Sequence, residues 1–209
     1  LPSNKFSEFR SILEWGLIYS LLEENCINTP CIKDSWPKYL KFFEENLTPK
    51  DVVIFSWARD RIVKNRSDKL VREPNQKKLN ILKEKLIELI YVIKNRKSKL
   101  ILVDDIPKVC PDTINFRQQI IVRGKIEKCV IDKSITLEDR KPMTLLFKEL
   151  SNKDEDIFYF DPHDFLCKET ICDLMDSNNK MLYMDASPHF SSENPEPLLD
   201  EWKLFLRNI

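Results

Sequence analysis

The sequence predicts an α/β protein, a three-layer α/β/α sandwich built on a mostly parallel β-sheet. Short runs that are continuously apolar, as in strands buried on both faces, alternate with longer segments of helical periodicity. The chain has 209 residues, of which 42% are hydrophobic, and this is enough for one domain with a substantial core. We therefore expect residues 1–209 to form a single domain.

Helices and strands alternate through the N-terminal half. Apolar residues at helical spacing predict one helix over residues 7–24 and another over 36–47. The apolar run 52–55, preceded by Asp51, predicts a buried strand over 51–55. The clearest periodicity lies in 75–96, where leucines and isoleucines recur every three or four positions between charged residues. This pattern is typical of the packed face of a surface helix.

The same alternation continues to the C-terminus. Further helices are predicted over 136–150 and 197–207, and segment 113–131 is ambiguous, with a helix as one interpretation. The remaining predicted strands are 99–103, 157–160 and 181–184. Because buried strands that alternate with helices are typical of parallel sheets covered on both sides, we expect these elements to form three layers.

Composition excludes several classes of function. Lys plus Arg and Asp plus Glu both number 34, so no net charge favours nucleic acid or an anionic membrane as a partner. No apolar run reaches the roughly 20 residues needed to cross a bilayer. Glycine occurs only at Gly16 and Gly124, which excludes the glycine-rich loops that bind phosphates and dinucleotides. We expect no cofactor.

Six cysteines offer several possible pairings. They are Cys26 and Cys31, Cys110 and Cys129, and Cys167 and Cys172. Three local disulfides are the simplest arrangement, although sequence alone permits many others. Buried free thiols are one alternative, and a four-thiolate zinc site built from the two close pairs is another. Disulfides would indicate an oxidising compartment outside the cytoplasm.

Functional sites in open α/β sheets form beyond the carboxyl ends of the strands. The residues there are Ser56, Trp57, Arg59 and Asp60; Asp104 and Asp105; Asp161 and His163; and Asp185 and His189. An acid on the same loop as a histidine can fix the imidazole tautomer, which leaves the other ring nitrogen to accept a proton from a hydroxyl nucleophile. Asp185 and His189 fit this role, and Pro188 would stiffen their loop. A solvated turn is the alternative interpretation.

Two other strand ends carry similar residues. Asp161 and His163 also lie after a strand, where a simple turn histidine is the plainer interpretation. Asp104 and Asp105 could contribute to a metal site, but a third and a fourth ligand are not evident. We expect them to form a solvated loop, and we predict no metal site.

Taken together, the segments "DVVIFSWARDR", "LILVDDIP", "IFYFDPHDFLCKETIC" and "MLYMDASPHFSS" follow a recognisable order. This order resembles the extracytoplasmic SGNH (GDSL-like) domain that is fused to membrane acyltransferases which O-acylate cell-surface glycans. In that family, a strand leads to a "D-P…L-C…C" segment, and a "lYxDxxHLS" block with the catalytic acid and base follows. The resemblance covers roughly residues 25–209.

The resemblance implies roles for individual residues. It implies that His189 is the general base, that Asp185 orients it, and that Cys167 and Cys172 form a small disulfide loop. The family's oxyanion glycine and asparagine lack clear counterparts, so the strand end at Trp57 and Arg59 would supply substrate-binding donors.

The sequence departs from the family pattern in two further places. Three residues separate Asp185 from His189, where the family has two. The "G-D-S" block that carries the nucleophilic serine is absent, and Ser3 lacks the preceding strand and Gly-Asp. We expect that the first strand and its serine lie upstream of Leu1.

By this resemblance, the function would be an O-acyltransferase, specifically an O-acetyltransferase, that modifies cell-surface polysaccharide by Ser-His-Asp chemistry. The partners would be an acyl donor, a glycan acceptor and a membrane acyltransferase domain of the same parent chain, which tethers the domain outside the cytoplasm. A glycan or acyl esterase is one alternative. The other is a non-catalytic accessory domain in which Trp36, Trp57 and Tyr183 stack on sugar rings. We expect no nucleic-acid partner.

Overall fold

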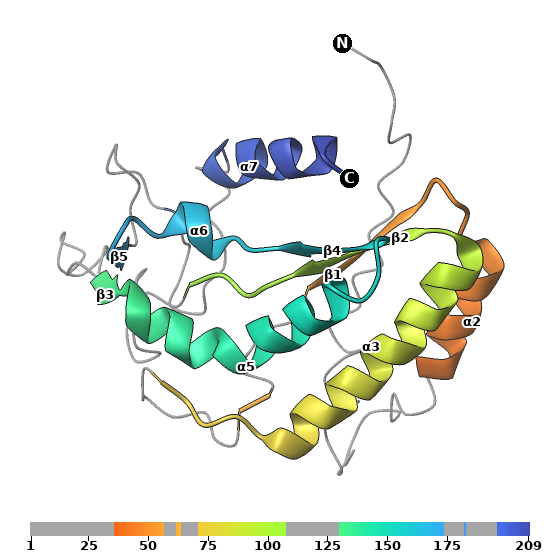
Figure 1. Cartoon of the computed structure of the whole chain (residues 1–209), viewed down its shortest axis with the longest axis horizontal. Helices are drawn as coiled ribbons and strands as arrows, with labels where there is room; N and C mark the ends of the chain where they lie inside the picture. The colour runs from red at the N-terminus through yellow and green to blue at the C-terminus, as the bar shows by residue number, and fades with distance from the viewer. Residues whose placement is uncertain (1–35, 57–61, 64–70, 108–129, 174–181, 183–195) are drawn as a thin grey trace, which may run out of the picture.

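The computed structural model describes most of the elements that the sequence predicts. The described residues are 36–56, 62–63, 71–107, 130–173, 182 and 196–209 (Figure 1). Helices and strands alternate through these ranges, and the strands lie in a layer between helices. This arrangement confirms the predicted α/β class with a parallel sheet flanked by helices.

The described sheet is three-stranded and parallel, in the order β1-β2-β4. Its strands are β1 (Val52–Ser56), β2 (Lys99–Val103) and β4 (Ile157–Phe160). The last residues of neighbouring strands are paired, Ser56 with Val103 and Val103 with Phe160. All three strands therefore end level, and the residues that follow them meet at one edge of the sheet.

Helices cover both faces of this sheet (Figure 1). On one face lie α3 (Gln76–Arg96) and α5 (Lys133–Ser151), and on the other lies α7 (Glu196–Arg207). Helix α2 (Trp36–Asn46) packs against α3. The indole of Trp36 joins these two helices, because its Nε1 donates to Glu88 Oε2 over 2.6 Å.

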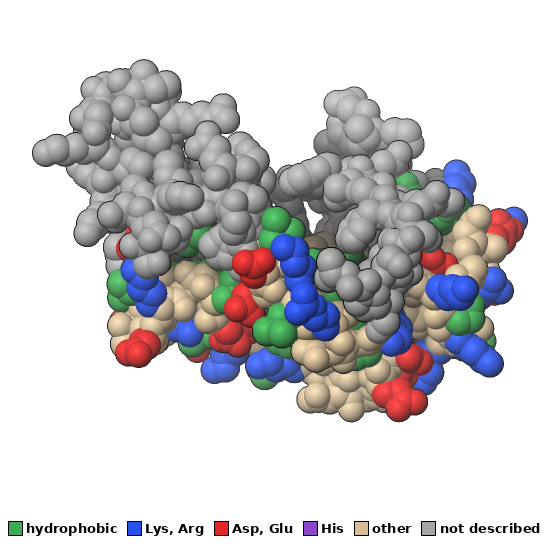
Figure 2. All heavy atoms as spheres, turned by 90° about the horizontal axis from the view of Figure 1, so that it is seen from above, with side chains coloured by type: hydrophobic (Ala, Val, Ile, Leu, Met, Phe, Trp, Pro, Cys, Tyr) green, Lys and Arg blue, Asp and Glu red, His purple; other side chains and the backbone are tan. Residues whose placement is uncertain are grey.

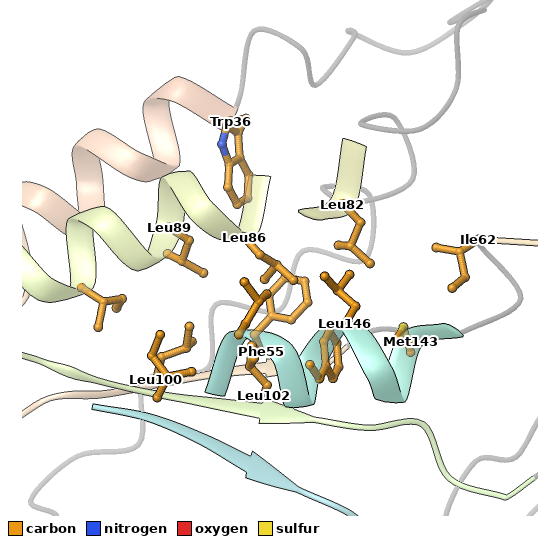
Figure 3. Packing of buried hydrophobic residues seen from close by; sticks show 14 of the residues in the cluster. Trp36, Phe55, Ile62, Leu82, Leu86, Leu89, Leu100, Leu102, Met143 and Leu146 are labelled. Atoms are coloured by element: carbon orange, nitrogen blue, oxygen red, sulfur yellow. The ribbon is translucent and has the colours of Figure 1, made fainter. Parts of the chain in front are cut away.

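The main core lies between the sheet and the α3–α5 layer (Figure 3). Side chains alternate between the two faces of a strand, so Leu100 and Leu102 face these helices together. Their partners on the helices include Leu82, Leu86, Leu89, Met143, Leu146 and Phe147. On the opposite face, Phe160 contacts the rings of Trp202 and Phe205, with centroids 4.7 and 5.0 Å away. These aromatic contacts hold α7 against β4.

Local sequence determines where the helices begin and end. The side chain of Asn75 accepts a hydrogen bond from the Lys78 amide at the start of α3, and that of Asp132 accepts one from Ser134 at the start of α5. Lys97 caps the C-terminal end of α3, with a φ of 53° in the left-handed region that favours glycine. The chain then turns directly into β2.

Three short elements were not predicted. Strands β3 (Val130–Asp132) and β5 (Ile171–Asp173) form an antiparallel pair, and α6 (His163–Leu166) is a single helical turn. Elements of three or four residues are too short for a periodic pattern. The last two residues of segment 113–131, which the sequence left ambiguous, belong to β3, and the other residues of this segment lie outside the described ranges. So do the predicted helix 7–24 and most of the predicted strand 181–184.

The described surface agrees with the neutral charge of the sequence. Acidic and basic side chains lie beside one another on the face seen in Figure 2, without a patch of one sign among the described residues. None of the helices in the described ranges has the length and apolar character needed to cross a membrane.

Candidate functional site

Two carboxylates occupy the edge at which the parallel strands end. Asp104 directly follows β2, and Asp161 directly follows β4. The amide of Asp104 donates to the carbonyl of Phe160 over 3.0 Å, which continues the pairing of the two strands by one residue. The two acids are therefore neighbours in space, although they lie 57 positions apart in the sequence.

Arg140 links these two carboxylates. It projects from α5, where it is buried at 4% exposure among the core residues of that helix. Its Nη1 and Nη2 donate to the two carboxylate oxygens of Asp161 over 2.5 and 2.6 Å. Nη1 also lies 3.3 Å from Oδ2 of Asp104. One planar guanidinium therefore fastens α5 to the ends of both β2 and β4.

Hydroxyl groups complete the surroundings of Asp104. Its Oδ2 accepts hydrogen bonds from Thr144 Oγ1 and Tyr159 OH, each over 2.6 Å. Its Oδ1 accepts the amide of Asp105 over 2.8 Å. Tyr159 OH lies 3.1 Å from Oδ2 of Asp161 as well, so it also contacts the second acid. Both oxygens of the buried Asp104 carboxylate thus have donors.

The charges in this cluster shift one another's ionisation. Burial alone would raise the pKa of Asp161, but the hydrogen bonds and charge of Arg140 outweigh burial and hold this pKa below its usual value. Burial opposes the charge of Arg140 too, yet Asp161 and Asp104 raise the pKa of the guanidinium. Burial and the charge of Asp104 raise the pKa of Tyr159. The phenol therefore stays protonated and acts as a donor.

This arrangement corrects the expectation of a solvated loop after the second strand. Asp104 is 1% exposed, and Asp105 is half-buried. The expectation failed because the partners of Asp104 come from α5 and β4, which are remote in sequence. With its oxygens occupied by donors, Asp104 is suited to hold the strand ends in place and is poorly suited to contact a substrate.

His163 lies next to this cluster, at the start of α6. Its amide donates to Oδ1 of Asp161 over 3.0 Å. Its Nε2 lies 2.5 Å from the hydroxyl of Thr136, which comes from α5. Instead of the simple turn histidine that the sequence favoured, His163 begins the helical turn α6 and is 0% exposed. A side chain so enclosed does not reach a substrate, so His163 is no catalytic base in this conformation.

Cys167 and Cys172 form a disulfide, as the resemblance implied. The bond connects the end of α6 to β5, and both residues are buried, at 5% and 0% exposure. The sulfur atoms lie 3.7 and 3.9 Å from Nε2 of His163. The other four cysteines, Cys26, Cys31, Cys110 and Cys129, lie outside the described residues.

Comparison with known families agrees with this fold and its strand-end segments. The family model described as "SGNH domain (fused to AT3 domains)" matches residues 18–202. The chain belongs to this family. No curated protein matches the sequence. The suspected SGNH relationship is therefore confirmed over most of the chain.

The catalytic residues predicted for the SGNH domain lie outside the described ranges. These are Asp185 and His189, together with the substrate-binding candidates Trp57 and Arg59. Ser56 is the last residue of β1 and comes immediately before Trp57. It is exposed at the edge of the sheet where the strands end. Trp36 is 5% exposed and bonded to Glu88, so it belongs to the core and is no platform for a sugar.

Sequence reasoning missed the α5 residues of the SGNH domain that contact the strand ends. Thr136, Arg140 and Thr144 recur every four positions, on the side of α5 that also carries the buried Met143 and Phe147. Polar residues at the spacing of a buried helical face were the available signal, because such residues require partners in the interior. The identity of those partners was not readable from the spacing.

Proposed function

We propose that this SGNH domain takes part in the O-acylation, specifically the O-acetylation, of a cell-surface polysaccharide. The match of residues 18–202 to a family fused to AT3 acyltransferase domains carries the proposal. A domain joined to an acyltransferase is well placed to receive its acyl group and pass it to an acceptor. The "YMDASPHFS" block supplies the acid and the base for such a transfer.

The proposed chemistry has two half-reactions that use the same base. A serine hydroxyl attacks the acyl carbonyl and gives its proton to His189, which passes the proton to the leaving group. A sugar hydroxyl then attacks the acyl-serine and gives its proton to His189, which returns the proton to the serine. Asp185 orients the imidazole and stabilises its positive charge. We assign the serine to no residue of 1–209, and Trp57 and Arg59 remain candidates for oxyanion and substrate contacts.

Features of the described residues support this assignment. The parallel strands end level at one edge, where α/β proteins form their sites. Leu182 is 4% exposed, so the chain is anchored in the interior three residues before Asp185. His163 is enclosed, which leaves His189 as the remaining histidine of the chain for the role of base. The Cys167–Cys172 disulfide supports placement in an oxidising compartment outside the cytoplasm.

Ester hydrolysis by the full-length protein tests the base. The wild-type protein is expected to hydrolyse p-nitrophenyl acetate, and His189→Ala is expected to lower the rate by about a thousand-fold or more. Circular dichroism would verify that the variant is folded. Full activity in the folded alanine variant would remove His189 from the mechanism.

Product analysis separates transfer from hydrolysis. With a polysaccharide acceptor present, a transferase forms the O-acetylated glycan, whereas an esterase releases acetate at the same rate with or without the acceptor. If neither product forms and calorimetry detects glycan binding that His189→Ala leaves unchanged, the domain is an accessory binding module. Intact mass before and after reduction tests the compartment, because three disulfides add about six hydrogens when reduced.

A further inference from the structure

Several side-chain atoms that could bind a metal ion lie together in the buried surroundings of His163. Nε2 of His163, Sγ of Cys167 and Sγ of Cys172 all lie within 4.8 Å of one another. The hydroxyl of Thr136 adjoins them, 2.5 Å from Nε2 and 3.4 Å from Sγ of Cys172. One nitrogen, two sulfurs and one oxygen therefore lie close together in the interior.

We propose that these residues form a latent zinc site, which the Cys167–Cys172 disulfide closes and which reduction of that disulfide opens. Two thiolates and one imidazole are a ligand set that zinc prefers, and such sites take an oxygen in the fourth position. The spacing agrees, because His163 begins α6, Cys167 follows the last residue of that helix four positions later, and Cys172 comes after four intervening residues. This proposal is independent of acyl transfer.

The distances between ligand atoms fit the proposal. With Zn–S near 2.3 Å and Zn–N near 2.1 Å, a tetrahedral site separates nitrogen from sulfur by about 3.6 Å. Nε2 of His163 lies 3.7 Å from Cys167 Sγ and 3.9 Å from Cys172 Sγ. The imidazole is thus already near the position of a ligand. Two changes remain. The two sulfurs must separate, which their covalent bond prevents, and the Thr136 hydroxyl, 2.5 Å from Nε2, must move to about 3.4 Å from it to serve as the fourth ligand.

A phosphine reductant supplies the two electrons that are needed to break the Cys167–Cys172 disulfide and open the site. Reduction breaks the S–S bond, and the phosphine gains an oxygen from water while the two sulfurs each gain a proton. Zinc then replaces these two protons as it binds the thiolates. Since His163 and Cys172 are 0% exposed, we expect the ion to enter while the chain folds or opens locally. Either linkage, disulfide or zinc, would fasten α6 to β5.

Cobalt binding under anaerobic conditions tests the site. The wild-type chain, reduced with a phosphine, is expected to bind Co²⁺ with the absorption of tetrahedral thiolate coordination, and Zn²⁺ is expected to displace it. The oxidised chain should give no such spectrum. The affinity of His163→Gln should fall by about ten-fold or more. His189→Ala is the matched control, because it removes the other histidine and should bind as the wild type does.

The remaining cysteines require their own background measurement. A Cys167→Ser/Cys172→Ser variant retains the other four, so any cobalt spectrum that it gives is independent of the proposed site. An unchanged spectrum and affinity in this variant or in His163→Gln would overturn the proposal, as would absence of binding to the reduced wild type. If the reduced chain unfolds, refolding with zinc replaces the titration. Zinc should then restore the circular dichroism of the wild type but not of His163→Gln, and any other result contradicts the site.

Discussion

Arg140 and Asp161 form a two-point ion pair that ties α5 to the end of β4. Both terminal nitrogens of the guanidinium contact the carboxylate, over 2.5 and 2.6 Å. The same group reaches Asp104 at the end of β2. One guanidinium thus faces the buried carboxylate of Asp104 and the partly buried carboxylate of Asp161, and the position of the strand ends depends on it.

Replacement of Arg140 should therefore be strongly destabilising. Arg140→Met leaves the buried carboxylate of Asp104 and the partly buried carboxylate of Asp161 without their cation, which typically costs about 3–5 kcal/mol for a buried pair. Urea denaturation would measure the loss. Lys141→Met is the matched control, because the Lys141 side chain is 59% exposed and should contribute less than about 1 kcal/mol. A similar effect for both variants would contradict the role of the cluster.

Stability should fall in acid partly through Asp161. Its pKa is lower in the folded chain than the value near 3.9 of an unfolded Asp. Its ionised form therefore contributes stability that is fully present above about pH 4 and is lost as pH falls through the folded-state pKa. Asp161→Asn should flatten the profile of unfolding free energy against pH in that window. An unchanged slope would show that another carboxyl dominates.

Lys97 offers a way to stabilise the chain. Its φ of 53° costs a non-glycine residue conformational energy that glycine avoids. Lys97→Gly should raise the free energy of unfolding by about 0.5 kcal/mol after the entropy of glycine in the unfolded chain is subtracted. Lys97→Ala, which keeps the β-carbon, should give no such gain. Thermal denaturation of the pair would detect the difference, and equal midpoints would contradict it.

The Cys167–Cys172 disulfide should contribute less to the free energy of unfolding than a disulfide between residues distant in sequence would. Cys167 and Cys172 enclose a small loop, for which loop-closure entropy predicts about 2 kcal/mol. Under oxidising conditions, the Cys167→Ser/Cys172→Ser variant should lose about that amount in urea denaturation. A loss well above this value would indicate that packing of the two buried sulfurs contributes as well.

Asp185 should affect the rate of ester hydrolysis because it orients the proposed base, His189. Asp185→Asn is expected to lower ester hydrolysis by about a thousand-fold or more while the fold is retained, since the imidazole loses its orienting charge. Asp164→Asn alters an exposed acid on α6 and serves as the control. If the two variants retain equal activity, Asp185 does not orient the base.

The sequence predicts those helices and strands whose hydrophobic pattern extends over several consecutive residues. The runs at 100–103 and 157–160 are apolar without interruption because both faces of β2 and β4 are covered, and α3 repeats its apolar stripe over 21 residues. The three-residue strands β3 and β5 have no such repeat. They are held by pairing with each other and by the nearby disulfide.

The strand-end cluster was less predictable because its contacts are distant in sequence. Asp104 was recognisable as a strand-end acid, but its cation lies 36 positions away on α5. His163 was recognisable as a histidine beside an acid, but its burial depends on Thr136 and the disulfide. The roles of Asp185 and His189 came from a family block and remain predictions.

The level ending of β2 and β4 also limits how the length of this chain can vary. Val103 pairs with Phe160, and the acids that share Arg140 come immediately after each. One residue inserted within β2 would turn Leu100 and Leu102 toward the opposite face and move Asp104 out of reach of the guanidinium. Insertions and deletions in related sequences should therefore avoid 99–104 and gather in turns such as the one between α5 and β4.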